Sequence, residues 1–558
     1  QDRAELNSGK TLGDLRRERL ARLEAMGERA ARIERIRGAA LPSSAVLPEE
    51  TQSFIVQSSS SSARVQIEEE IASVGGRVSQ QFSAPGLLQV TIPRTAVRDL
   101  AALSSISYVS PDRLVESLGQ IEETTGAAQI RNLISNTVLN GSDIGVAVLD
   151  SGMDTKHFLI DSSNGHRGVV AEKDFTGTSS TQDPYGHGTH VTSILAGTSS
   201  FASGAYTGIA YNARILNLRV LDQQGVGASS TIITAIDWCI ANKSLYNIRV
   251  MNLSLGTAAK DSYTVDPLCL AARRAHDAGI VVVAAAGNDG KDASGGKIYG
   301  GIQSPGIDPS VITVGATNSF STVVRSDDTV TTFSSRGPTR GYTVVNGNKV
   351  YDNLIKPDLV APGNKITAAA AYYYDGNAYS ALSQAFPRFV GAKSSETKSQ
   401  LIQMSGTSMS VPVVAGAVAL LLQANSTLTV NQVKAILMYT AQPLTGFNML
   451  EQGAGELNID GAVRVALNVP SDPTLTGSNA NGGNKKSTPP DISVAASAIG
   501  GTTFVWSQGV ITNYGFAYGS DLMSLWQSAY GQVNLLSDAT LVSNGSFSPG
   551  KYDFTGSV

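Results

Sequence analysis

Residues 403–422 read QMSGTSMSVPVVAGAVALLL, a polar turn that runs directly into ten small or apolar residues. Because residues 413–422 are apolar on every side, they predict a helix buried inside a domain, and they are too short to cross a bilayer, which needs about 20 such residues. Pro412 is tolerated within the first helical turn, so we expect Ser408 at the helix start. Ser408 could cap this helix, or it could use the helix dipole, which favours developing negative charge beside its hydroxyl.

The composition is typical of a globular protein with neutral polar loops. The chain has 558 residues, of which 16% are charged, and a net charge of −4. This length predicts roughly two to four folding units. The charge gives no electrostatic footprint for nucleic acid, so we expect no nucleic-acid partner. No transmembrane run occurs, and Gln1 follows no signal-like stretch, which suggests a processed chain. Cys239 and Cys269 could form one disulfide or remain two buried thiols.

Changes in pattern along the chain predict five segments. Residues 1–50 form a helical extension and linker, whose amphipathic helix we expect to dock on a neighbour rather than on a membrane surface. Residues 51–118 alternate strands and helices in the β-α-β-β-α-β order of a ferredoxin-like α+β domain. In residues 119–468, apolar strands alternate with helices, which predicts an α/β domain with a parallel sheet covered by helices on both faces. Residues 469–490 are a Gly-, Ser-, Asn- and Pro-rich linker, and residues 491–558 form a C-terminal extension of unknown function.

Polar residues with chemical potential follow the predicted parallel strands. Strand 144–149 leads to Asp150, and the strand that ends at Ala285 leads to Asn288, so both reach the edge where chemistry gathers in parallel sheets. His187 lies between two glycines at the start of another buried helix. A metal pair of His187 with His190 lacks a third ligand at sensible spacing, and we expect no metal there.

Three motifs, taken in order, resemble the signatures of the subtilisin-like serine peptidases, the subtilase family. They are Asp150-Ser151-Gly152, His187-Gly188-Thr189-His190 and Gly406-Thr407-Ser408-Met409. The chain order Asp, His, Ser separates this family from other serine hydrolases. Shorter supporting matches are residues 252–256, 285–288, 333–338 and 356–363. The resemblance covers roughly residues 129–463, and residues 51–118 resemble the inhibitory propeptide of this family.

The resemblance implies a role for each catalytic residue. Ser408 would attack the peptide carbonyl, with His187 as the base that takes its proton and later protonates the leaving amine. Asp150 would hold the imidazole in the required tautomer. Asn288 and the backbone N–H of Ser408 would stabilise the oxyanion.

The resemblance also implies a substrate cleft. Two extended edges would pair with the substrate backbone as added strands, and they consist of Gly225, Val226 and Gly227 and of Ser254, Leu255 and Gly256. Ala285, Gly287 and Gly256 would line the pocket for the side chain before the scissile bond. Such small walls predict a roomy, largely apolar pocket, with Asp289 near its rim. Three apolar residues either line a second pocket or pack in the core, namely Leu221, Ile232 and Leu255.

The chain departs from the family pattern at a common calcium site. Residues 157–160 read HFLI where many relatives carry a calcium ligand. That site is therefore doubtful; structural calcium at another oxygen-rich loop stays open, and no cofactor is required for the chemistry. Longer loops are expected at residues 318–331, 341–353 and 372–396, where they could reshape the cleft rim.

These observations predict a secreted serine endopeptidase that cleaves protein or peptide substrates through an acyl-enzyme, with broad or apolar-preferring specificity. It would be made as a zymogen, with its own propeptide as an intramolecular inhibitor. Self-cleavage is expected between Glu116 and Glu123, with residues 113–118 in the cleft as product. Two alternatives are a non-enzymatic scaffold that keeps the fold and a maturation protease with one cognate substrate.

Overall fold

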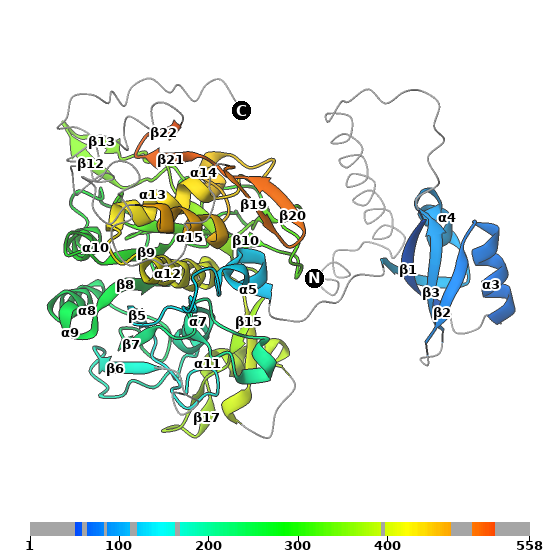
Figure 1. Ribbon diagram of the computed structural model, residues 1–558, viewed down its shortest axis with the longest axis horizontal. Helices are drawn as coiled ribbons and strands as arrows, with labels where there is room; N and C mark the ends of the chain where they lie inside the picture. Colours follow the sequence, from blue (N-terminus) through cyan, green and yellow to red (C-terminus); the bar gives the residue numbers. More distant parts are fainter. Residues whose placement is uncertain are drawn as a thin grey trace. The chain divides into compact units, whose positions relative to one another are not determined.

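The computed structural model describes residues 51–58, 64–82, 86–111, 120–161, 168–391, 397–469 and 494–518. The chain divides into two compact units, Gln1–Val115 and Glu116–Val558 (Figure 1). The predicted helix within residues 1–50, the predicted linker 469–490, and the product segment 113–118 lie outside the described residues.

The N-terminal unit has the predicted β-α-β-β-α-β order. Its antiparallel sheet has the strand order β2-β3-β1-β4. The bounds are β1 (Thr51–Ser58), α3 (Arg64–Ser73), β2 (Arg77–Gln81), β3 (Leu87–Pro93), η1 (Arg94–Ala96), α4 (Val97–Ala102) and β4 (Ile106–Pro111). Phe54 and Val56 of β1 pack with Ile71 of α3 and Leu100 of α4 in one core. Both helices therefore cover one face of the sheet.

The second unit contains an eight-stranded sheet with the order β11-β10-β9-β8-β5-β7-β6, and β14 also pairs with β10. Every pairing is parallel except that of β10 with β11. The bounds are β5 (Gly145–Asp150), β6 (Val169–Asp174), β7 (Arg214–Arg219), β8 (Ile248–Leu253), β9 (Val281–Ala285), β10 (Ile312–Asn318), β11 (Thr329–Val330) and β14 (Leu359–Pro362).

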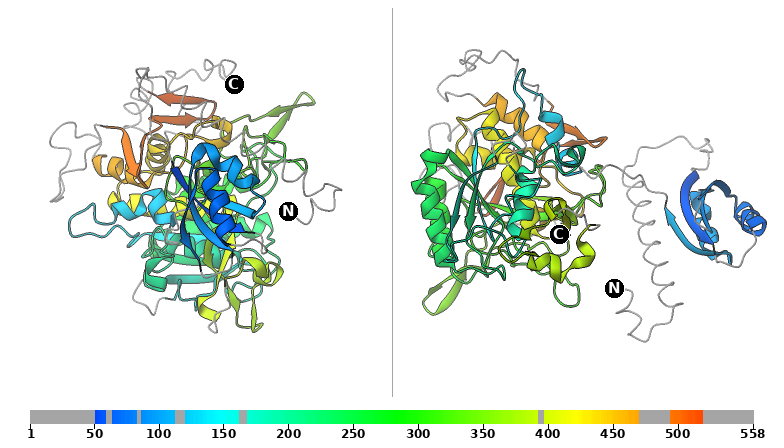
Figure 2. Two further views of the ribbon diagram at one scale, coloured as in Figure 1. Left: turned by 90° about the vertical axis from the view of Figure 1, so that its right-hand side faces the viewer. Right: turned by 90° about the horizontal axis from the view of Figure 1, so that it is seen from below.

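Helices cover both faces of this sheet, as predicted (Figures 1 and 2). Along β5, Val146 and Val148 join the core that contains α7 (His187–Ala196) and α12 (Thr407–Ala424). The alternate residue Leu149 joins a second core with α8 (Ser229–Ala241) and α10 (Pro267–Asp277). Successive side chains of a strand point to opposite faces, so this division places one helix pair on each face. The α/β fold class is confirmed.

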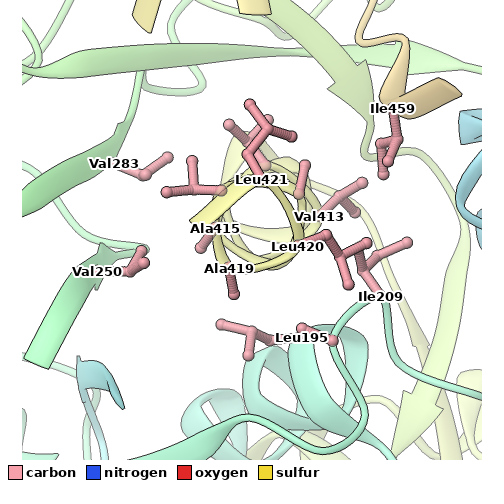
Figure 3. Close-up of a cluster of buried hydrophobic side chains, with 14 of the residues drawn as sticks. Leu195, Ile209, Val250, Val283, Val413, Ala415, Ala419, Leu420, Leu421 and Ile459 are labelled. Carbon is pink, nitrogen blue, oxygen red and sulfur yellow. The ribbon is translucent and has the colours of Figure 1, made fainter. Parts of the chain in front are cut away.

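Helix α12 runs through the middle of the larger core (Figure 3). Around it lie Leu195 of α7, Val250 of β8, Val283 of β9 and Ile459 of α15 (Ile459–Asn468). The sequence predicts that this helix is too short for a membrane. In length this is wrong, because the helix has 18 residues and continues beyond residues 413–422 at both ends. Among the described residues, α12 is the one helix long and apolar enough to span a bilayer, but 89% of it is buried in the protein. It is the core helix that the sequence predicts.

Pro412 lies deeper in α12 than the sequence suggests. The helix begins at Thr407, so Pro412 is its sixth residue and falls beyond the first turn. Proline has no N–H to donate to the carbonyl four residues earlier, which belongs to Ser408. The Ser254 hydroxyl donates to that carbonyl instead, at 2.9 Å. This bond replaces the missing helical one and ties the chain after β8 to the start of α12.

The region beyond α12 includes two β-hairpins that pack on the same unit. Their strands are β19 (Ala496–Ile499), β20 (Thr502–Val505), β21 (Gly509–Thr512) and β22 (Gly515–Tyr518). Arg325 is fully buried beneath Phe504 of β20, with its guanidinium 4.9 Å from the ring centroid. Its Nη1 donates to the carbonyls of Thr124, at 2.6 Å, and Leu457, at 2.9 Å. This part of the predicted C-terminal extension is thus packed against the α/β unit.

Shorter elements complete the second unit. They are α5 (Gln120–Thr125), α6 (Ala127–Ile130), η3 (Phe201–Gly204), α9 (Lys243–Tyr246), β12 (Tyr342–Val345), β13 (Asn348–Tyr351), β15 (Ile366–Ala369), β16 (Tyr372–Tyr373), β17 (Ala378–Tyr379), α11 (Ala381–Ala385), η4 (Pro387–Phe389), η5 (Thr397–Ser399), β18 (Leu401–Met404), α13 (Val430–Thr440) and α14 (Met449–Gln452). Cys239 and Cys269 are both buried free thiols, which settles the alternative of a disulfide between them.

Candidate active site

Asp150 and His187 meet at the carboxyl edge of the sheet. Asp150 ends β5, and His187 is the first residue of α7. The His187 Nδ1 donates to Asp150 Oδ1 at 2.7 Å, and the carboxylate is 1% exposed. A Cβ on Gly188 would lie 2.2 Å from the carbonyl oxygen of Gly152, so glycine is needed for this close approach of the two loops.

The electrostatic surroundings favour the protonated form of His187. Burial lowers the pKa of this imidazole, but the charge of Asp150, the hydrogen bond to it and the charge of Asp183 together outweigh burial. The resulting pKa is raised above the ordinary value of 6.5. A base that is stabilised once it gains a proton suits general acid–base work.

Ser408 is the second residue of α12 and is half-buried. It lines one pocket together with His187 and Asn288. Its hydroxyl donates to the backbone carbonyl of Ser254 at 3.0 Å. The bond shown for this hydroxyl thus goes to Ser254 rather than to His187. Catalytic hydrogen bonds are often long before substrate binds, and rotation about the Cα–Cβ bond would redirect the hydroxyl.

The amide of Asn288 is held in a defined orientation. Its Oδ1 accepts hydrogen bonds from the backbone N–H of Thr407, at 2.9 Å, and from the Thr407 hydroxyl, at 3.2 Å. Nδ2 therefore remains as a donor on a residue that lines the pocket of Ser408. The N-terminus of α12 adds backbone N–H groups with no acceptor within the helix, and together these donors suit an oxyanion.

Asp183 is a buried carboxyl group that the sequence reasoning missed. It accepts hydrogen bonds from the Ser151 hydroxyl (2.7 Å), from the backbone N–H groups of Gly186 (2.7 Å) and Thr189 (2.8 Å), and from the Thr189 hydroxyl (2.7 Å). These donors flank Asp150 on one side and His187 on the other. The available signal was an acid four residues before a His framed by glycines. Asp183 is a positioning residue for that pair.

Asp183→Asn is expected to shift the acidic limb of the pH profile of kcat/KM to lower pH. The Asp183 charge helps to raise the pKa of His187, and the neutral imidazole is the active base, so loss of the charge lets the base persist at lower pH. The measurement is kcat/KM against pH for a peptide substrate. Asp237→Asn serves as the control, because Asp237 is 51% exposed and pairs with Arg274. A limb that stays in place, or moves upward, contradicts this role.

The two predicted substrate edges lie together on another side of His187. All six edge residues, from Gly225 to Gly227 and from Ser254 to Gly256, line a pocket of about 430 Å³. Leu221, Ile232 and Leu255 line the same pocket, while Leu221 and Ile232 also belong to the buried core. Leu221 and Ile232 therefore line the pocket and also pack in the core, and Leu255 lines the pocket and packs against that core.

The expectation of a roomy, apolar pocket between the small walls is wrong because the Gln303 side chain lies there. A Cβ on Gly256 would lie 2.8 Å from Gln303 Oε1, and a Cβ on Gly287 would lie 2.8 Å from Gln303 Cγ. Gln303 Nε2 donates to Asp289 Oδ2 at 2.8 Å. The space between the two glycine walls thus holds an amide backed by a carboxylate.

Gln303→Ala is expected to raise the preference for Phe over Ala before the scissile bond by about tenfold, since a better filled apolar pocket discriminates by roughly 10- to 200-fold. The measurement is kcat/KM for paired substrates that differ only at that position. Gln303→Leu is the matched control, because it removes the amide but keeps the bulk, so it should not admit the larger side chain. Equal preferences in Gln303→Ala and the unchanged chain would contradict a filling role.

The remaining histidines near the motifs are structural. His190 Nε2 lies 3.2 Å from the backbone carbonyl oxygens of Ile366 and Ile402, and burial lowers its pKa to about 3. At the doubtful calcium position, His157 Nε2 bonds the Gln400 carbonyl and Nδ1 accepts from the Leu159 N–H, so both ring nitrogens have partners within the protein. Within the described ranges, no group of three or more His, Cys, Asp or Glu side chains is placed to hold a metal.

A parallel α/β sheet with a serine at the start of its central helix and an Asp–His pair at the carboxyl edge defines a class of serine hydrolases. The chain belongs to the subtilase family: the Peptidase_S8 profile, described as "Subtilase family", matches residues 141–462, more than half of the chain. It is therefore a subtilisin-like serine endopeptidase that acts on peptide substrates and needs no cofactor for catalysis.

Three relatives illustrate the likeness. Serine protease AprX of Bacillus subtilis (strain 168) is 35% identical over 374 residues, which cover 65% of this chain and 76% of the relative. Subtilisin E of the same organism is 31% identical, with 71% of this chain and 85% of the relative covered. An extracellular serine proteinase of Thermus sp. (strain Rt41A) is 30% identical, with 66% and 74% covered.

Proposed function

We propose that Asp150, His187 and Ser408 act as the catalytic triad of this endopeptidase. The observation that carries the proposal is the 2.7 Å bond from His187 Nδ1 to the buried Asp150, beside a pocket that His187 shares with Ser408 and Asn288. Asp150 keeps the proton on Nδ1, so Nε2 is free to act as a base.

In this proposal, Ser408 Oγ bonds to the substrate carbonyl carbon while its proton passes to His187 Nε2. The carbonyl oxygen becomes an oxyanion, which accepts hydrogen bonds from Asn288 Nδ2 and the Ser408 N–H. Collapse breaks the C–N bond, and the imidazolium of His187 gives its proton to the leaving amine. Water then repeats the sequence on the acyl-enzyme and frees Ser408.

Labelling with a fluorophosphonate probe tests this assignment directly. The probe should label the protein at Ser408 and should fail to label Ser408→Ala. Ser244→Ala, in exposed α9, is the matched control and should label as the unchanged chain does. If the unchanged protein stays unlabelled at probe concentrations that label serine peptidases, it is a scaffold without turnover.

We further propose that residues 51–118 act as an inhibitory propeptide. The support is a compact unit in which both described helices, α3 and α4, pack on one face of the sheet. On the opposite face lie Ile55 and Gln89, which are half-buried, and Tyr108, which is 57% exposed. A sheet face with apolar and amide side chains, on which no helix among the described residues packs, is suited to dock on another surface.

The expected cleavage window of residues 116–123 needs a correction. Gln120–Thr125 is helix α5, and a peptidase cleft binds its substrate as an extended strand. Cleavage at residues 120–123 would first require the helix to unwind. We therefore propose a cut before Gln120, in residues that lie outside the described ranges.

Incubation of purified precursor, followed by N-terminal sequencing, tests self-processing. The expected product starts at or before Gln120 and is absent for Ser408→Ala. Cleavage of Ser408→Ala at the same site, without another protease, would refute self-processing.

Secretion is proposed because relatives include a protein named as extracellular, and recovery of the mature species from culture medium tests it. A random peptide library separates broad specificity from a single cognate substrate, which would give a narrow sequence logo.

A further inference from the structure

The pocket that contains Ser408 and Asn288 continues to an apolar wall outside the two substrate edges. Its volume is about 490 Å³. Apolar side chains of its lining come from α11, η4, β18 and the region after α11, namely Leu382, Phe386, Phe389, Ile402 and Met404. Phe386 and Phe389 are 47% and 41% exposed, so large aromatic surface faces solvent beside the nucleophile.

Leu382, Phe386 and Phe389 of this wall belong to the long loop of residues 372–396, and backbone bonds fix the segment 381–391 at both ends. The N–H groups of Ala381 and Leu382 donate to the carbonyls of Pro184, at 2.9 Å, and Tyr185, at 3.1 Å. Gly391 N donates to the Leu401 carbonyl at 2.9 Å. The first contact leads to His187 and the second to β18, which precedes Ser408. The wall is thus anchored to both catalytic loops.

The aromatic side chains of the wall also support one another. The ring centroids of Phe386 and Phe389 are 6.5 Å apart at an interplanar angle of 48°, and the Arg388 guanidinium lies 4.8 Å from the Phe389 ring centroid. Ring pairs at this separation attract each other. The two rings therefore stabilise each other's position in the wall.

The two pockets divide a bound peptide between them. The backbone edges, Gly225–Gly227 and Ser254–Gly256, belong to the other pocket, and His187 and Tyr185 line both. If the acyl half of a substrate pairs with those edges, an extended chain that passes Ser408 must leave through the pocket with the aromatic wall. His187, which protonates the leaving amine, stands between the two halves.

We propose that Leu382, Phe386 and Phe389 form a subsite that selects a large apolar side chain, aromatic or long aliphatic, on the leaving half of the substrate. The side chain belongs to the first residue after the scissile bond. This inference rests on the proposed function, because it uses the position of Ser408 as the point of cleavage. Desolvation of two exposed rings by an apolar partner supplies the preference.

Quenched peptides with one fixed acyl half and with Phe, Leu, Gly or Asp after the scissile bond test this subsite. The unchanged enzyme should prefer Phe or Leu over Gly by about tenfold or more in kcat/KM. In Phe386→Ala/Phe389→Ala, the preference should fall to within about twofold, and Phe386→Leu/Phe389→Leu should restore part of it. Leu245→Ala is the control, because Leu245 is 68% exposed on α9, just before the amino end of β8.

A methyl ester of the same acyl half separates this inference from the proposed function, since its leaving group does not reach the wall. Unchanged ester hydrolysis with a lost Phe preference supports the subsite. If the unchanged enzyme does not hydrolyse the ester, the proposed function is refuted instead. If the double variant does not fold, the acyl-enzyme of the unchanged chain is allowed to react with water in the presence of Phe-amide or of Gly-amide. The fraction of the acyl group that each amide captures is then compared. Equal capture of both amides, or an equal preference in enzyme and variant, overturns the proposal.

Discussion

Ser408→Ala is expected to lower kcat for peptide hydrolysis by about 10⁶. The reason is that Ser408 supplies the attacking oxygen, while the two neighbouring hydroxyls are engaged elsewhere: the Thr407 hydroxyl donates to Asn288 Oδ1, and Ser405 Oγ accepts from the Lys365 N–H. Residual hydrolysis of about 10³–10⁴ over water should remain, because oxyanion donors and binding still act on an attacking water.

The measurement is kcat and KM with a chromogenic peptide, with Ser244→Ala as the matched control. KM should change little, since the alanine keeps the backbone edges and the pocket walls. Ser408 also donates one hydrogen bond to Ser254, so thermal unfolding of both variants should be compared. A loss of less than about a hundredfold would mean that Ser408 is not the nucleophile.

Asp150→Asn is expected to lower kcat by about 10⁴ while the fold is retained. Asp150 Oδ1 accepts from His187 Nδ1 at 2.7 Å and from the Ser151 N–H at 2.8 Å. Both bonds end on the same oxygen, so an asparagine either keeps them without the negative charge or turns its N–H₂ group toward Nδ1 and favours the imidazole with its proton on Nε2. That tautomer cannot take the proton of Ser408. In either case, the imidazolium of His187 lacks the negative charge of Asp150 that stabilises it.

The kinetics of Asp150→Asn are measured beside those of Asp237→Asn, an exposed substitution of the same kind. Near-UV circular dichroism shows whether the core of the variant is intact. A variant that unfolds would report on burial rather than on catalysis, in which case Asp150→Glu gives a second reading of the same contact. Full activity of folded Asp150→Asn would remove Asp150 from the proposed triad.

Much of the fold could be predicted because its causes are local. Strand β5 is apolar up to Asp150, and helix α12 is apolar or small from Val411 to Leu422, which burial on every side explains. Parallel strands bring their carboxyl ends to one edge, so Asp150 and Asn288 could be placed there without coordinates. The position of His187 beside Asp150 follows from the family motifs rather than from periodicity.

The residues that were missed depend on pairing between distant segments. Gln303 reaches its place because its own N–H donates to the Ala286 carbonyl, and Ser304 bridges to Thr257. The periodicity of the sequence does not indicate such contacts between distant segments. Asp183 acts through donors in two loops at once, and a carboxyl group in a turn gives the same sequence signal whether it caps that turn or organises two of them.

The buried Arg325 links two segments of the second unit that are far apart in the sequence. Its guanidinium donates to the carbonyl of Thr124, near the end of α5, and lies under Phe504 of β20. If either segment separates from the core, the buried charge of Arg325 loses a partner that it has in the folded protein. Local opening of one segment therefore carries an electrostatic cost that the other segment shares.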